Sequence, residues 1–177
     1  MPARILIVTA AFGEGHNSAA RNLALALDET GAETRVADPC MLGIPRLTQG
    51  LCKAYRFVTT YQPRLWARVY RGTADVDFSR QRMPLMRRPE RALEALIDDF
   101  RPDAVVATYP LYPYFLDRIF ASSGRRIPVF TVVTDSIEIN AAWLKAPDTR
   151  WLVTDAHTRR ETNDHGLDAA RVSETGF

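Results

Sequence analysis

The residue types that could carry out chemistry gather in one short segment, Gly13-Glu-Gly-His-Asn-Ser18, shortly after an apolar run. Gly13 and Gly15 would let the backbone turn sharply and approach a ligand closely. Ser18 has a side chain typical of a helix N-cap, and the free N–H groups of a helix N-terminus favour a phosphate or another oxyanion. The segment is neither a Gly-x-Gly-x-x-Gly dinucleotide motif nor a P-loop with its lysine. We therefore expect Gly13, Gly15, Asn17 and Ser18 to contact an anionic ligand of another kind.

His16 is the most informative single residue of this segment. An imidazole beside a loop that favours phosphate could act as a general base near neutral pH. The alternative is a histidine that only caps the helix or bonds a neighbouring loop. The loop by itself leaves both interpretations open, because short motifs of this kind have low specificity.

Two further segments carry candidate residues where other apolar runs end. Asp135 follows the run 128–134 and could orient a histidine, bind a hydroxyl group or simply cap a turn. Tyr109 and Tyr112 lie in a loop with two prolines, which could line an acceptor pocket, although aromatic loop residues more often pack against a core.

The elements that must position these residues alternate along the chain. The run 4–11 is apolar and β-branched, which is typical of a strand buried on both faces of a parallel sheet. Further strands are expected at 33–37, 103–108, 128–134, 151–154 and 172–175, and helices at 18–31, 89–100, 112–122 and 156–165. This alternation predicts an open parallel α/β sheet, in which ligands bind beyond the carboxyl ends of the strands.

Residues 39–89 interrupt the alternation, with helix-like pieces at 51–61 and 65–72, no strand, and an expected mobile loop over 75–88. Residues 46–91 hold 11 Lys and Arg against 3 Asp and Glu (11 − 3 = +8), whereas the whole chain has a net charge of +2. Arginines among aromatic residues are typical of a segment that binds nucleic acid or an anionic membrane surface. They are also typical of a solvated pair of helices whose aromatic faces pack on the core. Because no RNA-binding motif is present, we expect a membrane and no nucleic acid.

Length and composition limit the remaining possibilities. The 177 residues, 46% hydrophobic and 25% charged, suit one folded domain. Cys40 and Cys52 cannot form a disulfide framework, and their spacing does not match a zinc site, so a reducing cytosol and no metal are expected. No apolar run is long enough to span a bilayer, so membrane contact is expected to be peripheral.

Three segments together resemble a known family: Phe-Gly-Glu-Gly-His-Asn-Ser-Ala-Ala-Arg at 12–21, Pro-Val-Phe-Thr-Val-Val-Thr-Asp at 128–135 and Val-Ser-Glu-Thr-Gly-Phe at 172–177. They resemble the N-terminal domain of monogalactosyldiacylglycerol synthases and of bacterial processive diacylglycerol glucosyltransferases. The resemblance implies a Rossmann-like open parallel sheet with helices on both faces, the N-terminal half of a GT-B fold. It makes 1–177 the acceptor-binding domain, 39–89 a membrane-contacting insertion, and the protein cytoplasmic and bound peripherally to the inner face of the membrane.

The resemblance also implies a reaction. His16 would be the general base that deprotonates diacylglycerol, Asp135 a polar residue of the cleft, and residues 46–91 the contact with anionic lipid. The donor would be UDP-galactose or UDP-glucose, shared with a C-terminal domain that the 177 residues lack, and no cofactor is implied. The chain alone is therefore expected to have negligible transferase activity. Two alternatives remain: a non-catalytic α/β module that binds a phosphorylated ligand or anionic lipid, and a glycosyltransferase with a different acceptor.

Overall fold

The computed structural model describes residues 1–62, 64–65, 68, 84–135 and 139–176. Six strands form one sheet, all parallel, in the order β2-β1-β3-β4-β5-β6. The strands are β1 (Arg4–Val8), β2 (Glu33–Ala37), β3 (Ala104–Ala107), β4 (Val129–Val132), β5 (Arg150–Val153) and β6 (Val172–Glu174). The predicted open parallel α/β sheet is confirmed, and the architecture is Rossmann-like.

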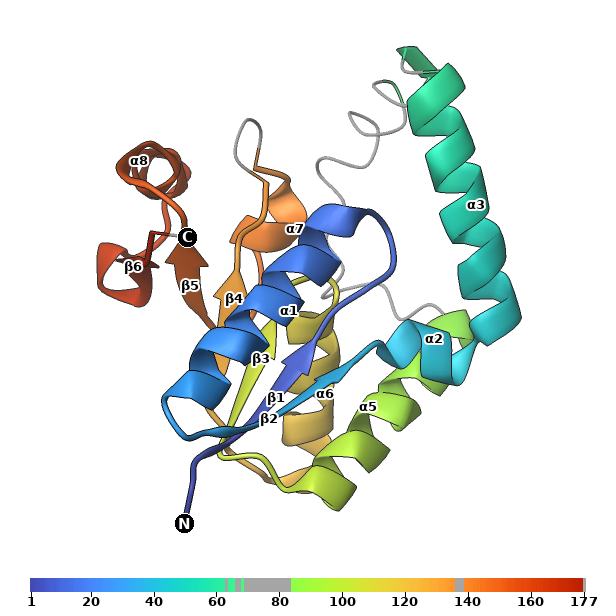
Figure 1. Ribbon diagram of the computed structural model, residues 1–177. Helices are drawn as coiled ribbons and strands as arrows, with labels where there is room; N and C mark the ends of the chain where they lie inside the picture. Colours follow the sequence, from blue (N-terminus) through green and yellow to red (C-terminus); the bar gives the residue numbers. More distant parts are fainter. Residues whose placement is uncertain (63, 66–67, 69–83, 136–138, 177) are drawn as a thin grey trace.

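Helices cover both faces of the sheet (Figure 1). They are α1 (Glu14–Glu29), α2 (Pro39–Gly43), α3 (Pro45–Tyr61), α5 (Arg87–Phe100), α6 (Tyr112–Ser123), α7 (Ala141–Leu144) and α8 (Ala156–Asp164), with short 3-10 helices η1 (Pro84–Met86) and η2 (Ala169–Arg171). Figure 1 shows α1 in front of the sheet and α6 behind it. Within the described residues, no helix has the length and apolar character needed to cross a bilayer.

The first strand shows why this sequence builds a two-sided sheet. Leu6, Ile7 and Val8 are all fully buried. Successive side chains of a strand point to opposite faces, so Leu6 and Val8 join the core formed with Leu93 of α5, whereas Ile7 joins Ala20 of α1 on the other face. An apolar run without polar alternation therefore marks a strand covered on both sides.

The strand order reverses direction beside β1. The chain passes from β1 through α1 to β2 on one side, and then adds β3, β4, β5 and β6 in turn on the other. In sheets of this kind the loops after the two strands at the reversal diverge and leave a crevice at their carboxyl ends. Here these are the loops after β1 and after β3, which contain the glycine-rich segment and Tyr109.

The start of α1 differs from the prediction. The helix begins at Glu14, so Gly15, His16, Asn17 and Ser18 lie in its first turns, and Ser18 is not the N-cap. The N-cap is Gly13, whose φ of 101° and ψ of 153° belong to a region that is essentially restricted to glycine. This backbone conformation at Gly13 reverses the chain abruptly, so the helix can start five residues earlier than a capping serine at position 18 would suggest.

The insertion is only partly described. Its first helix is the short α2; the helix predicted at 51–61 is α3, which starts at Pro45 and rises beside the start of α1, away from the sheet (Figure 1). The predicted helix at 65–72 lies mostly outside the described residues, as does 75–83 of the predicted mobile loop. Residues 84–88 are not a loop, because they form η1 and the beginning of α5.

Candidate active site

Two chain segments, one after β3 and one after β4, converge on His16 at the carboxyl ends of the strands. The Oγ1 atom of Thr134, just after β4, lies 2.8 Å from His16 Nδ1. Thr108, at the end of β3, donates a hydrogen bond of 3.2 Å from its hydroxyl to the His16 carbonyl. The ring of Tyr109 meets the imidazole edge-on, with 5.1 Å between the ring centroids. His16 is thus held from two neighbouring strand ends, at the crevice where the strand order reverses.

The surroundings of His16 keep its imidazole neutral. Burial lowers the pKa of His16 below its ordinary value of 6.5, while the negative charge of Asp135 and a hydrogen bond with the Thr108 backbone oppose that shift. Because burial is the largest of these effects, the ring carries no charge at neutral pH. A neutral imidazole can accept a proton, which is the first requirement for a general base.

Asp135 lies close to His16 and is held by another partner. Its Oδ2 atom accepts a hydrogen bond of 2.8 Å from the indole Nε1 of Trp143 in α7. Trp143 is fully buried, and its ring also lies against His16, with 6.1 Å between the centroids. The structure therefore brings the two predicted residues His16 and Asp135 together, and Trp143 fixes the carboxylate that acts on the imidazole by its charge.

The remaining predicted residues differ in what they offer a ligand. Asn17 Oδ1 accepts a hydrogen bond of 3.0 Å from Thr9, and Ser18 Oγ accepts one of 3.3 Å from Arg21. Both side chains thus have partners within the chain. A side chain at Gly15 would meet nothing within 4 Å, so the backbone of the first turn of α1 is accessible there. That first turn has no side-chain cap.

Helix α3 forms a wall over the glycine-rich segment. A Cβ atom at Gly13 would lie 3.7 Å from the hydroxyl oxygen of Tyr55. Arg56, the next residue, forms an ion pair of 3.6 Å with Glu14 at the start of α1. Burial, followed by the charge of Asp135, raises the pKa of Tyr55, so its phenol stays protonated. The basic-aromatic insertion therefore borders the candidate site.

Comparison with known proteins places the chain in a family. Residues 16–177, from His16 onward, match the family model described as monogalactosyldiacylglycerol (MGDG) synthase. The chain belongs to the monogalactosyldiacylglycerol synthase family. It is 26% identical over 175 residues to a protein of Bacillus cytotoxicus named processive diacylglycerol beta-glucosyltransferase. That alignment covers 98% of this chain and 44% of the relative, so the chain spans less than half of the relative's length.

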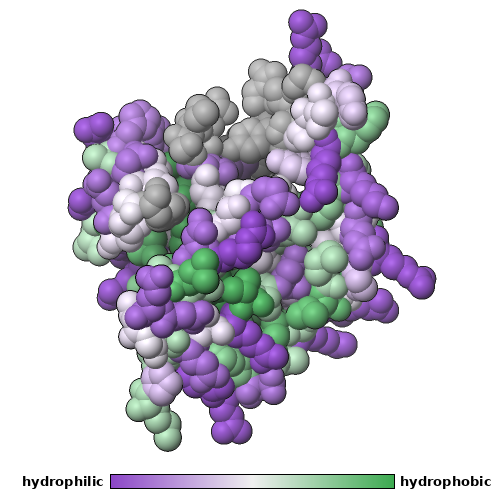
Figure 2. Space-filling view, viewed as in Figure 1, coloured by the Kyte–Doolittle hydropathy of each residue, from purple (hydrophilic) through white to green (hydrophobic). Residues whose placement is uncertain are grey.

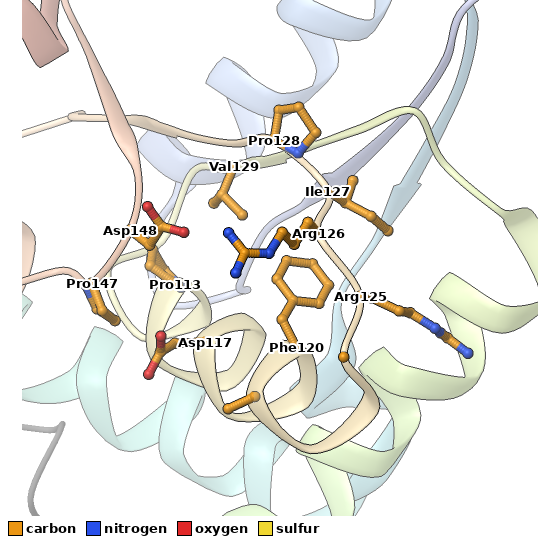
Figure 3. Close-up of a pocket in the computed structure, with 12 residues that line it drawn as sticks. Pro113, Asp117, Phe120, Arg125, Arg126, Ile127, Pro128, Val129, Pro147 and Asp148 are labelled. Atoms are coloured by element: carbon orange, nitrogen blue, oxygen red, sulfur yellow. The ribbon is translucent and has the colours of Figure 1, made fainter.

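A pocket with a volume of about 570 Å³ lies elsewhere on this member of the monogalactosyldiacylglycerol synthase family and contains none of the residues around His16. It opens at Pro128 and Val129, where β4 begins, and so at the opposite end of the sheet from His16. Figure 3 shows the Arg126 guanidinium directed into it near Asp148, while Arg125 points away. Ligands of parallel sheets bind at the carboxyl ends of the strands, which favours the crevice beside His16.

Sequence reasoning missed three residues that shape the site. Trp143 lies in a helix that was not predicted, and only the folded chain brings its indole to Asp135. Thr108 and Thr134 were visible as residues at strand ends, yet nothing local indicated that they would bond His16. Among the described residues, no group of three or more metal-ligating side chains could hold a metal ion.

Proposed function

We propose that this chain is the acceptor-binding domain of a glycolipid glycosyltransferase, which transfers a hexose from UDP-glucose or UDP-galactose to diacylglycerol with His16 as general base. The observation that carries the proposal is a neutral imidazole at the carboxyl ends of the strands, whose Nδ1 lies 2.8 Å from the Thr134 hydroxyl and whose backbone carbonyl accepts from Thr108. Membership of the monogalactosyldiacylglycerol synthase family and the printed name of the Bacillus relative support the lipid acceptor and the hexose.

The proposed reaction is a single displacement at the anomeric carbon of the sugar. The hydroxyl of diacylglycerol gives its proton to His16, and its oxygen forms the new bond to that carbon. The bond between the carbon and the UDP oxygen breaks, and its electron pair leaves with UDP, so the sugar carbon is inverted. Since Thr134 engages Nδ1, Nε2 is the nitrogen assigned to receive the proton.

The donor would meet the start of α1. The first turn of α1 exposes N–H groups without a side-chain cap, and a helix N-terminus favours the negative charge that develops on a departing diphosphate. Glu14 in that turn opposes an anion, but it is paired with Arg21 and Arg56. We assign the remaining contacts of the UDP-sugar to a C-terminal domain of a GT-B arrangement, because this chain covers 44% of its relative.

Helix α3 is proposed to contact the anionic inner face of the membrane, which would make the protein cytoplasmic and peripheral. Leu47, Leu51, Phe57 and Tyr61 are exposed along α3, as two pairs, 47/51 and 57/61, whose members lie one helical turn apart. The helix also carries Arg46, Lys53 and Arg56 and no acidic residue, a combination that suits anionic head groups. Figure 2 shows hydrophilic side chains projecting from this edge of the molecule with hydrophobic ones between them.

The test is transfer of radiolabelled hexose to diacylglycerol by the full-length gene product. His16→Ala should reduce turnover by about 100-fold or more, which is typical for loss of a general base. The matched control is His157→Ala, because His157 is exposed and lies on α8, a different helix from that of His16. Near-normal turnover of His16→Ala, with the fold intact by circular dichroism, would contradict the proposal. The 177-residue chain alone should transfer no measurable sugar.

A further inference from the structure

An apolar pocket of 250 Å³ lies beside the candidate active site and has no role in the proton transfer. It is bordered by Phe12, just before the glycine-rich segment, by α2 and α3, by η1 and by the loop after β3. The residues that define it are Phe12, Ile44, Leu51, Met86, Tyr109 and Leu111. These side chains come from five separate stretches of the chain, so the pocket is a product of the tertiary fold.

The inner wall of the pocket is shared with the base. Tyr109 lines the pocket and also meets the His16 ring edge-on, with 5.1 Å between the centroids. Phe12 lines it too and stacks on Tyr109, with 5.8 Å between the centroids. A molecule inside this pocket would therefore lie one aromatic ring away from the imidazole.

The outer wall of the pocket continues onto α3. Leu51 lines the pocket and is 43% exposed. It belongs to the exposed apolar residues of α3, one helical turn after Leu47. A continuous apolar path therefore leads from the proposed membrane-facing surface of α3, past Leu51, to Tyr109 beside His16.

The polar side chains that line the pocket are few and uncharged. The Thr48 hydroxyl donates to the carbonyl oxygens of Cys40, at 2.9 Å, and Ile44, at 3.0 Å. Burial raises the pKa of the Cys40 thiol to about 11, so it stays uncharged. No charged side chain is among the lining residues. Such a lining suits a hydrocarbon chain rather than a sugar or a head group.

We propose that this pocket binds the first part of one acyl chain of the lipid acceptor and thereby places the glycerol hydroxyl beside His16. This inference rests on the proposed function, because it names where that acceptor is held. The pocket is smaller than the 300–1,000 Å³ or so of typical ligand sites, so it takes a segment of one chain while the rest stays in the bilayer.

The test is photocrosslinking of the chain by a dioctanoylglycerol that carries a diazirine in one acyl chain, presented in mixed micelles and mapped by mass spectrometry. Labelling is expected on the peptides that contain Leu51 and Tyr109. Leu51→Trp and Met86→Trp should each fill the pocket and reduce that labelling at least fivefold. Leu47→Trp is the matched control, since Leu47 shares the exposed surface of α3 and does not line the pocket.

Labelling spread along the outer surface of α3, or labelling reduced equally by Leu47→Trp and Leu51→Trp, would overturn the inference. Displacement of the probe by octanoate as well as by dioctanoylglycerol would overturn the assignment to the acceptor. Circular dichroism and thermal unfolding of each variant establish that it is folded. His16→Ala should lose turnover and keep the labelling, so the failure of the base assignment and the failure of the pocket give different results.

Discussion

The Nδ1 atom of His16 lies 2.8 Å from the hydroxyl oxygen of Thr134, while the neighbouring carboxylate of Asp135 is bonded to the indole of Trp143. The direct partner of the imidazole is therefore a neutral group, and the carboxylate acts on it only through its charge. A neutral partner orients the ring without stabilising its protonated form as a carboxylate would. This division of roles agrees with a pKa of His16 that is lowered by burial in spite of the nearby negative charge.

Replacing Thr134 tests the orienting role of its hydroxyl. Thr134→Val keeps the shape and removes the hydrogen bond, so turnover of the full-length protein should fall by about two- to twelvefold, in line with the roughly 0.5–1.5 kcal/mol typical of one hydrogen bond. Thr134→Ser should restore most of the turnover. In the 177-residue chain, the imidazole ¹⁵N shifts should show Nδ1 protonated in the native protein and a mixture of tautomers in Thr134→Val.

The chain has three histidines, so the His16 signals can be assigned by comparing spectra of His157→Ala and His165→Ala. Normal turnover together with unchanged ¹⁵N shifts in Thr134→Val would show that the hydroxyl does not select the tautomer.

The charge of Asp135 predicts a change in pH dependence. This charge raises the pKa of His16, so Asp135→Asn should lower that pKa further while an amide oxygen still accepts from Trp143. The base is active when unprotonated, and the acidic limb of the kcat/KM profile should therefore move to lower pH. Titration of the His16 ring by NMR gives the same shift independently. Asp148→Asn, at the opposite end of the sheet, should leave both unchanged; an upward shift in Asp135→Asn would contradict the prediction.

The two glycines of the segment should respond to alanine in opposite ways. Gly13 has a φ of 101°, and an L-residue forced into that region costs about 1–3 kcal/mol, so Gly13→Ala should lower the free energy of unfolding by that amount. Gly15 lies in the first turn of α1 with open space around it, and alanine favours a helix over glycine by up to about 1 kcal/mol. Urea unfolding of both variants measures the difference. Equal changes in the free energy of unfolding for the two variants would show that position 13 does not need glycine for its backbone conformation.

The fold was predictable from patterns that act locally. The uninterrupted apolar run at β1 indicated a strand covered on both faces, and Leu6, Ile7 and Val8 are fully buried for that reason. Because parallel strands end at the same edge, the positions of His16 and Asp135 after two such strands were sufficient to expect them near one another.

The remaining features depend on the tertiary fold. The start of α1 at Glu14 follows from the backbone conformation at Gly13, which a serine at a plausible cap position obscured. The hydrogen bond from Thr9, just after β1, to Asn17 Oδ1 joins two segments whose contact no local pattern indicated. The bond between Asp135 and Trp143 joins residues on either side of residues 136–138 and depends on α7 packing into the core.

The exposed surface of α3 predicts membrane binding that combines apolar insertion and charge. Phe57→Asp places a carboxylate on the surface of α3 that also exposes Leu51 and Tyr61, and its desolvation together with repulsion from anionic lipid should release the chain from vesicles of phosphatidylglycerol and phosphatidylcholine. Leu25→Asp is the matched control, because Leu25 is 63% exposed, comparable to Phe57 at 60%, and lies on α1. Co-sedimentation should be strong at low salt and weaken as salt rises, since screening over about 10 Å at 0.1 M removes the attraction of the arginines. Equal binding of the two variants would move the membrane contact away from α3.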